Sequence, residues 1–174
     1  MAGLIVIIAV AVIFAFAMIL KKRPNIPDIN KVSNIRDVVM SVNHGRIYPF
    51  FTGMNLKRAE EQARKIHPNA NEFDNALQMQ NLMGIKPYFD IPVSNKYIER
   101  ISVMFNNNGI VSSIGADIKD FHINMKPLIE EMLVKFGEPT SMDDEFIIWR
   151  ENWMVINIHK DGSLSVIDER LFGR

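Results

Sequence analysis

Three residues in the second half of the chain have types and a spacing that could bind a metal ion. Asp117, Asp120 and His122 form a D-x-x-D-x-H pattern, and carboxylate and imidazole groups are common ligands of divalent metals. The same residues could serve a hydrolase. The alternative interpretation is a set of surface polar residues ahead of a helix. It is much the stronger, since no HxH or HExxH spacing accompanies the pattern.

Other catalytic patterns are missing from the sequence. The glycines are isolated, so the chain has no phosphate-binding loop, and no GxSxG motif is present. The absence of cysteine excludes disulfides, thiolate metal sites, a cysteine nucleophile and a lipid-modified cysteine. We therefore predict no catalytic residue, no cofactor and no metal, and we expect a protein that is not an enzyme.

The densest acidic run and the two tryptophans are the candidate protein-binding residues. Asp143, Asp144 and Glu145 could dock a basic partner, although such a run is more often a solvated loop. Trp149 and Trp153 flank an expected tight turn and could anchor an interface. Core packing of one or both is the more common outcome. We take these five residues as candidates for contact with another protein, whose identity the sequence does not give.

Charge and composition exclude several classes of function. The 174 residues include 20 basic and 20 acidic ones, and 48% are hydrophobic. This hydrophobic content is enough for a core and excludes a wholly disordered chain. The balanced charge and the scattered basic residues indicate that the partner is no nucleic acid. The length suits one ordinary domain or two very small ones.

The first twenty residues are apolar throughout. Residues 3–20 read GLIVIIAVAVIFAFAMIL, and Lys21–Arg23 follow at once. A helix of this length is just long enough to cross the hydrocarbon core of a bilayer. A cleaved signal peptide is the alternative, but its positive charges precede the apolar stretch. We predict a transmembrane anchor over residues 1–23, with residues 3–20 in contact with the lipid bilayer.

The basic cluster after the apolar stretch predicts an orientation. Positive residues next to a membrane span tend to stay in the cytoplasm. We therefore expect a single-pass protein of the inner (plasma) membrane, with a soluble domain over residues 24–174 that faces the cytoplasm. A periplasmic domain is the alternative.

The rest of the chain alternates between helical and strand patterns. Apolar residues at helical spacing predict helices, and alternating β-branched residues between Asn/Asp-Gly turns predict antiparallel strands. We expect an α+β fold in which helices pack on an antiparallel sheet. The predicted helices cover residues 55–66, 72–83 and 125–136, and the predicted strands cover 101–105, 110–114, 146–149, 153–158 and 163–167.

The order of a helix followed by a hairpin occurs twice. One interpretation is a duplication, with tandem modules over residues 46–118 and 119–174. The other is the alternation that any α+β chain shows, since the first unit has an additional helix and the spacings differ.

The second unit resembles a family of small envelope modules, the BamE (SmpA/OmlA) type. The resemblance rests on a helix that ends in Phe136-Gly137-Glu138-Pro139, on Trp149 and on the strands around Asp161-Gly162. Tandem modules of this shape are similar to the β-lactamase inhibitor protein fold. The resemblance implies two helices on an antiparallel sheet that binds protein rather than performing catalysis. The chain differs from the envelope lipoproteins because it has no cysteine for lipidation.

Together these patterns favour a bacterial, membrane-anchored protein-binding module. An immunity or inhibitor protein that neutralises a toxin is one form of this function. The alternative is an accessory protein of envelope assembly or of a secretion machine.

Overall fold

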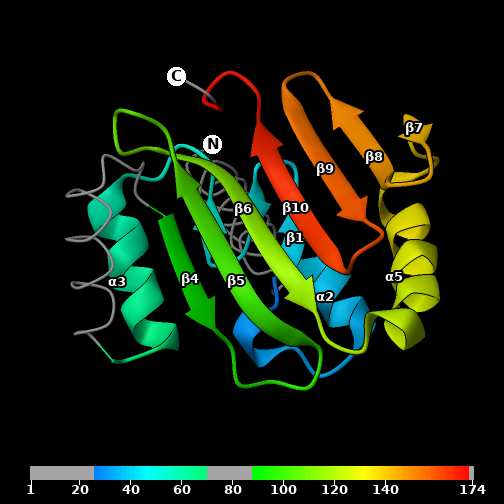
Figure 1. The fold of residues 1–174 in the computed structure, drawn as a ribbon, viewed down its shortest axis with the longest axis horizontal. Coiled ribbons are helices and arrows are strands. Elements are labelled where there is room, and N and C mark those ends of the chain that lie inside the picture. The colour runs from blue at the N-terminus through cyan, green and yellow to red at the C-terminus, as the bar shows by residue number, and fades with distance from the viewer. Residues whose placement is uncertain (1–25, 70–87, 173–174) are drawn as a thin grey trace, which may run out of the picture.

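The chain folds as α+β, with helices beside one seven-stranded antiparallel sheet. A computed structural model describes residues 26–69 and 88–172. The order of the strands in the large sheet is β4-β5-β6-β10-β9-β8-β7, and a second sheet has the order β1-β2-β3. In Figure 1, α3 lies next to β4 at one end of the large sheet, and α5 lies beside β8 and β7 at the other.

The helices and strands have the following bounds. The helices are η1 (Ile29–Lys31), α2 (Ile35–Ser41), α3 (Leu56–Ile66) and α5 (Phe121–Phe136). The strands of the small sheet are β1 (Val42–Asn43), β2 (Arg46–Ile47) and β3 (Phe50–Phe51). The strands of the large sheet are β4 (Tyr88–Pro92), β5 (Ile98–Phe105), β6 (Val111–Ile118), β7 (Ser141–Met142), β8 (Phe146–Glu151), β9 (Met154–His159) and β10 (Ser163–Asp168).

One face of the large sheet forms the core. Ile101, Val103 and Phe105 alternate with exposed or half-exposed neighbours along β5 and are buried, as the sequence predicts. Leu56 of α3 and Leu133 of α5 pack against the same cluster. Because side chains alternate across a strand, this register leaves the other face of the sheet to residues such as Ser102 and Met104.

The helix predicted over residues 55–66 and the predicted turn between β5 and β6 are both confirmed. Asn55 accepts a hydrogen bond from the Arg58 amide at 2.9 Å and caps α3. Gly109 has a φ of +68° in the turn, which glycine adopts without steric cost. The amide of Leu56 donates to the Gly109 carbonyl at 2.9 Å. The start of α3 is therefore tied to the hairpin turn.

The helix predicted over 125–136 is longer than its pattern indicates. It begins at Phe121, after Asp120 in a left-handed conformation, so Asn124 is not its cap. Asn124 instead donates its side-chain amide to the Lys119 carbonyl at 2.7 Å. Pro127 thus lies inside α5 rather than in its first turn. Phe121 is buried, and this packing explains why the helix starts early.

The pairing of β6 with β10 joins the two predicted modules into one sheet. Ile114 pairs with Val166, and Ala116 pairs with Leu164. The expected boundary between residues 46–118 and 119–174 falls where β6 ends, just before α5. The duplication itself stays a prediction.

The predicted membrane anchor requires a correction. Within residues 26–69 and 88–172, no helix has both the length and the apolar character that a bilayer crossing requires. The longest, α5, has 16 residues, about 24 Å at about 1.5 Å per residue, against a bilayer core of about 30 Å. It also carries charged side chains such as Lys126 and Glu130. This finding contradicts the predicted transmembrane helix, single-pass topology and inner-membrane location.

Two predicted segments lie outside the described residues. These are the apolar stretch at 3–20 and the helix expected over residues 72–83.

Candidate functional site

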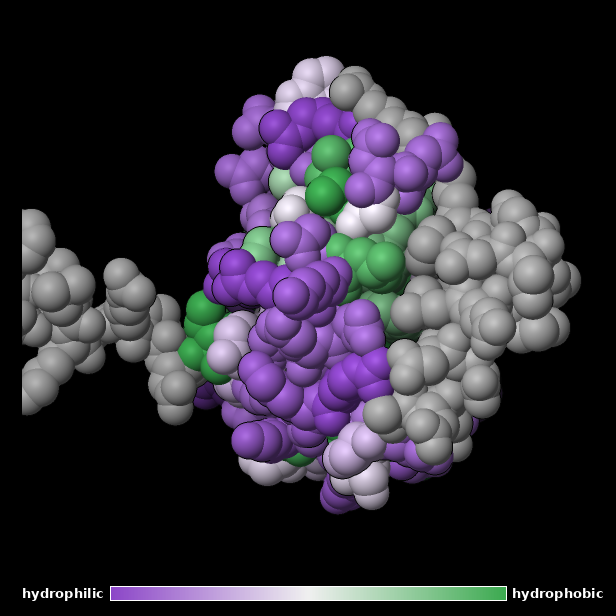
Figure 2. Space-filling model, turned by 90° about the vertical axis from the view of Figure 1, so that its left-hand side faces the viewer, coloured by the Kyte–Doolittle hydropathy of each residue, from purple (hydrophilic) through white to green (hydrophobic). Residues whose placement is uncertain are grey.

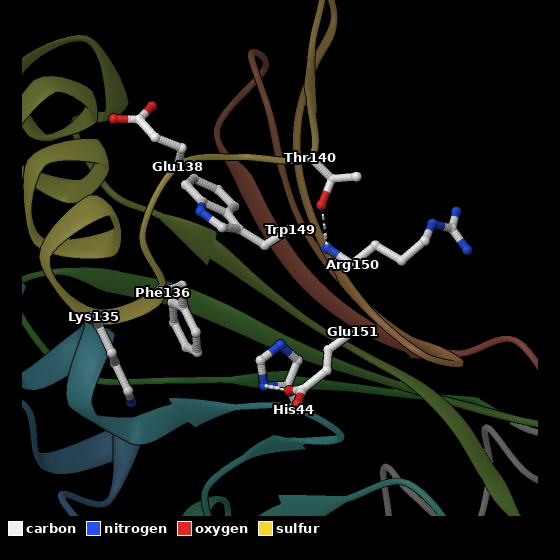
Figure 3. A pocket seen from close by; sticks show the side chains of 8 residues that line it. All are labelled: His44, Lys135, Phe136, Glu138, Thr140, Trp149, Arg150 and Glu151. Carbon is white, nitrogen blue, oxygen red and sulfur yellow. Dashed lines mark hydrogen bonds and ion pairs between the residues drawn. The ribbon is translucent and has the colours of Figure 1, made fainter.

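Three adjoining hollows meet at one histidine. His44 lines hollows of about 380, 360 and 290 Å³. Figure 3 shows the largest of them, between the end of α5, the edge of β8 and the turn that carries His44. Its lining residues are His44, Lys135, Phe136, Glu138, Thr140, Trp149, Arg150 and Glu151.

The turn between β1 and β2 places His44. Gly45 follows it with a φ of +77°. A Cβ atom at Gly45 would lie 2.9 Å from the Thr52 Oγ1 atom, closer than a van der Waals contact permits. Glycine is therefore required here by its backbone conformation and by the close approach of Thr52. The Thr52 amide also donates to the Gly45 carbonyl at 2.8 Å, which fixes the turn against β3.

The imidazole of His44 contacts β8 and α5. Its Nδ1 lies 2.8 Å from a carboxylate oxygen of Glu151, and its ring meets the Phe136 ring edge-on, with the centroids 5.4 Å apart. The Glu151 side chain is mostly exposed. A histidine–carboxylate pair can accept a proton. In the described part of the chain, however, no hydroxyl nucleophile is bonded to His44, and the pair instead links the His44 turn to β8.

Lys135, near the end of α5, also lines this hollow. Its ammonium group donates to the carbonyls of Val39 at 2.9 Å and of Met40 at 3.4 Å, and also to the carbonyl of Val42. These carbonyls end α2 and begin β1, so Lys135 joins α5 to both elements. In Figure 3 the side chain points toward that backbone and away from Trp149. Burial lowers the pKa of Lys135 to about 8.

The lowered pKa predicts how stability changes with pH. The pKa of Lys135 is about 8 in the folded chain against an ordinary value of 10.5, so between these values the unfolded chain holds more protons. Stability then rises with pH in this window and is flat below it. We expect wild type to gain stability relative to Lys135→Gln as the pH rises from 8 toward 10.5, measured by urea unfolding. A relative loss would mean that the three carbonyls stabilise the ammonium more than burial penalises it.

The two tryptophans have different environments. Trp149 on β8 is 3% exposed, and its indole N–H donates to the Gly137 carbonyl at 2.8 Å. It belongs to the core and holds the end of α5 against the sheet. Trp153 is 58% exposed in the two-residue turn between β8 and β9.

The turn that carries Trp153 is well fixed. Asn152 precedes it with a φ of +53°, a conformation that asparagine tolerates better than most residues. The Trp153 carbonyl accepts a hydrogen bond from the Glu169 amide at 2.9 Å. Trp153 also lines the second hollow at His44. The lining of that hollow is His44, Glu151, Asn152, Trp153, Met154 and Arg170, and we call these six residues the Trp153 surface.

The acidic run lies at the other end of β8 from Trp153. The carboxylate of Asp143 accepts hydrogen bonds from the amides of Phe146 and Glu145, and these bonds lower its pKa. Lys160 donates to the Asp143 carbonyl at 2.6 Å. Asp143 is therefore occupied in closing the turn before β8, and Asp144 and Glu145 are exposed beside it. The structure does not bring the acidic run and Trp153 together.

The D-x-x-D-x-H residues also have separate roles. Asp117 forms an ion pair with Arg100, at 2.5 Å. Asp120 precedes α5, and His122 is exposed in its first turn. Among residues 26–69 and 88–172, no group of three or more potential ligands is placed to hold a metal ion.

Comparison of the chain with protein families, with curated proteins and with solved structures finds no match. The resemblance to BamE-type modules and to the inhibitor fold therefore stays a prediction.

The sequence pointed to Trp153 but missed His44 and Lys135. The Asn43-His44-Gly45 segment indicates a turn, and nothing in its pattern shows that this turn lies against the β8–β9 turn. Lys135 looks like an ordinary exposed lysine at the end of a helix, because its carbonyl partners come from another part of the chain.

Proposed function

We propose that this protein binds another protein through the Trp153 surface. The observation that carries the proposal is a tryptophan 58% exposed on a turn held by backbone hydrogen bonds. An exposed tryptophan on a fixed backbone loses little conformational entropy on binding and can bury a large apolar area. Tryptophan is among the residues most enriched at the energetic centre of interfaces.

The hollow beside Trp153 supports the same function. His44, Met154 and Arg170 surround a depression next to the indole, so an apolar side chain of a partner can enter it while polar groups bond at the rim. Arg170 is held by the buried carboxylate of Asp168, whose two oxygens it contacts at 3.0 and 2.7 Å. The rim is therefore ordered before a partner arrives.

The form of binding that we favour is that of an immunity or inhibitor protein that neutralises a toxin. Its support is the resemblance of residues 136–167 to a family of modules that bind protein. The alternative is an accessory of envelope assembly or of a secretion machine. An inhibitor abolishes the activity of its partner when the two are mixed in equimolar amounts, whereas an accessory leaves that activity intact within a larger complex.

Site-specific photo-cross-linking tests the proposed surface. A benzoylphenylalanine is placed at Trp153 in the full chain, in cells that make the protein, and adducts are identified by mass spectrometry. We expect a discrete adduct with another protein from this position.

Two other exposed apolar positions serve as controls. Val134 on α5 and Met142 on β7 are more exposed than Trp153 but lie outside the Trp153 surface. The same probe at these positions should give little or none of that adduct. Equal yields from all three positions, or no adduct from position 153, would contradict the proposed surface.

A further inference from the structure

We infer that the partner presents carboxylates to a pair of arginines beside the Trp153 surface. This inference rests on the proposed function and adds the chemistry of the partner. The two arginines, Arg46 and Arg58, lie on one aromatic ring: their guanidinium carbons are 5.9 and 5.0 Å from the centroid of Phe51. We call these three residues the Arg–Phe stack.

Stacking on Phe51 orders the guanidinium groups and leaves their N–H donors free to form hydrogen bonds. Within the described residues, no carboxylate pairs with Arg46 or Arg58, and neither side chain donates a hydrogen bond there. Each guanidinium has five N–H donors in a planar fork that matches a carboxylate. The ring therefore holds two cations in place while their bonding edges stay open.

Helix α3 adds to the positive potential at the stack. Lys57 and Arg58 lie in its first turn, and that turn contains no acidic residue. The N-terminal end of a helix carries partial positive charge, so cations there are unfavourable for the helix itself. Glu61, three positions after Arg58 on the same helix, forms no ion pair with it. A carboxylate that arrives from outside would offset this cost.

The Arg–Phe stack is continuous with the Trp153 surface. Arg46, Phe51 and His44 line the third hollow, and Met154 lines both this hollow and the one beside Trp153. The other two arginines of this region are already neutralised, Arg170 by Asp168 and Arg150 by Glu169. Among the arginines of this part of the structure, those without a carboxylate partner are thus the two at the stack.

The surroundings favour an acidic protein over a nucleic acid. Figure 2 shows the side of the molecule that carries α3, where hydrophilic residues predominate and hydrophobic ones lie between them. A nucleic acid needs a track of phosphate contacts along its backbone, whereas Glu60 and Glu61 on α3 and Glu151 beside His44 interrupt such a track. The arginines adjoin a hollow that shares His44 and Met154 with the Trp153 surface, an arrangement that suits an acidic side chain near an apolar one.

Selection from a phage-displayed library of random short peptides tests the inference with the full chain as the target. We expect the selected peptides to be enriched in Asp and Glu next to a large apolar residue. Arg46→Gln/Arg58→Gln should weaken their binding about tenfold or more, because two charge-assisted contacts are lost. The matched control, Arg36→Gln/Lys126→Gln, removes the same charge from exposed positions that belong neither to the Arg–Phe stack nor to the lining of the three hollows, and it should change binding little.

The variants also separate a binding defect from a folding defect. Removing Arg58 from the first turn of α3 relieves an unfavourable interaction with the helix dipole, and this gain opposes the loss of the two contacts with the Phe51 ring, so the free energy of unfolding should change little. Loss of binding with unchanged or higher stability supports the inference.

Different failures have different meanings. Peptides that depend on Trp153 but not on the two arginines would overturn the acidic partner and leave the proposed surface standing. Peptides that depend on neither would overturn both. Binding of a fluorescent oligothymidylate that exceeds peptide binding, and that is lost in Arg46→Gln/Arg58→Gln, would overturn the acidic protein in favour of a nucleic acid.

Discussion

Replacement of Trp149 with alanine is expected to lower the free energy of unfolding by about 3–5 kcal/mol. The side chain is 3% exposed, and its indole N–H bonds to the Gly137 carbonyl at the end of α5. The variant leaves a cavity between α5 and β8 and deprives that carbonyl of its donor. Urea unfolding followed by circular dichroism measures the loss.

The second tryptophan is the matched control for the first. Trp153→Ala removes an indole of the same size from an exposed turn, so stability should change by about 0.5 kcal/mol or less. It should nevertheless abolish the binding of the selected peptides. Similar losses of stability in the two variants would show that the buried and the exposed tryptophan are wrongly assigned.

A second large effect is expected in the core of the sheet. Phe105→Ala should cost about 3–5 kcal/mol of unfolding free energy. Phe105 is buried, and its ring meets the Phe89 ring of β4 edge-on with the centroids 5.1 Å apart. The variant loses this aromatic pair as well as apolar area.

The neighbouring residue on the same strand provides the comparison. Met104 points to the other face of β5 and is 47% exposed. Met104→Ala should therefore cost less than about 1 kcal/mol. If the two variants were equally destabilised, or if Phe105→Ala cost less than about 1 kcal/mol, the register of β5 with its neighbours would be wrong.

Local sequence patterns predicted the helices and turns that are stabilised by interactions between residues close together in the sequence. The apolar stripe of α3 and its Asn55 cap depend on residues within a few positions of one another, as does the Asn106–Gly109 turn. The strands between residues 146 and 167 were predicted because apolar and polar side chains alternate there between short turns. The start of α5 was predicted four residues late, because the burial of Phe121 is a tertiary effect.

The position of Trp153 was also predictable only in part. The polar Glu151-Asn152 pair predicts a turn next to Trp153, but the predicted strand over 153–158 begins one residue too early, because β9 begins at Met154 and Trp153 lies in the turn. The exposure of Trp153 and the burial of Trp149 depend on which face of β8 meets the helices. The alternation of side chains along a strand makes the two faces differ, and only packing decides which of them is covered.

Sequence by itself determined that this chain is α+β, that its strands are antiparallel and that it has no cysteine chemistry. Only the tertiary structure decided where a surface for a partner lies. Thr52 and Met154, 102 positions apart, meet at the hollows around His44, and Lys135 reaches carbonyls 93 to 96 positions away. Periodicity and capping act between neighbours along the chain, whereas these contacts depend on how the small sheet, α5 and the β8–β9 turn pack together. No local pattern encodes that packing.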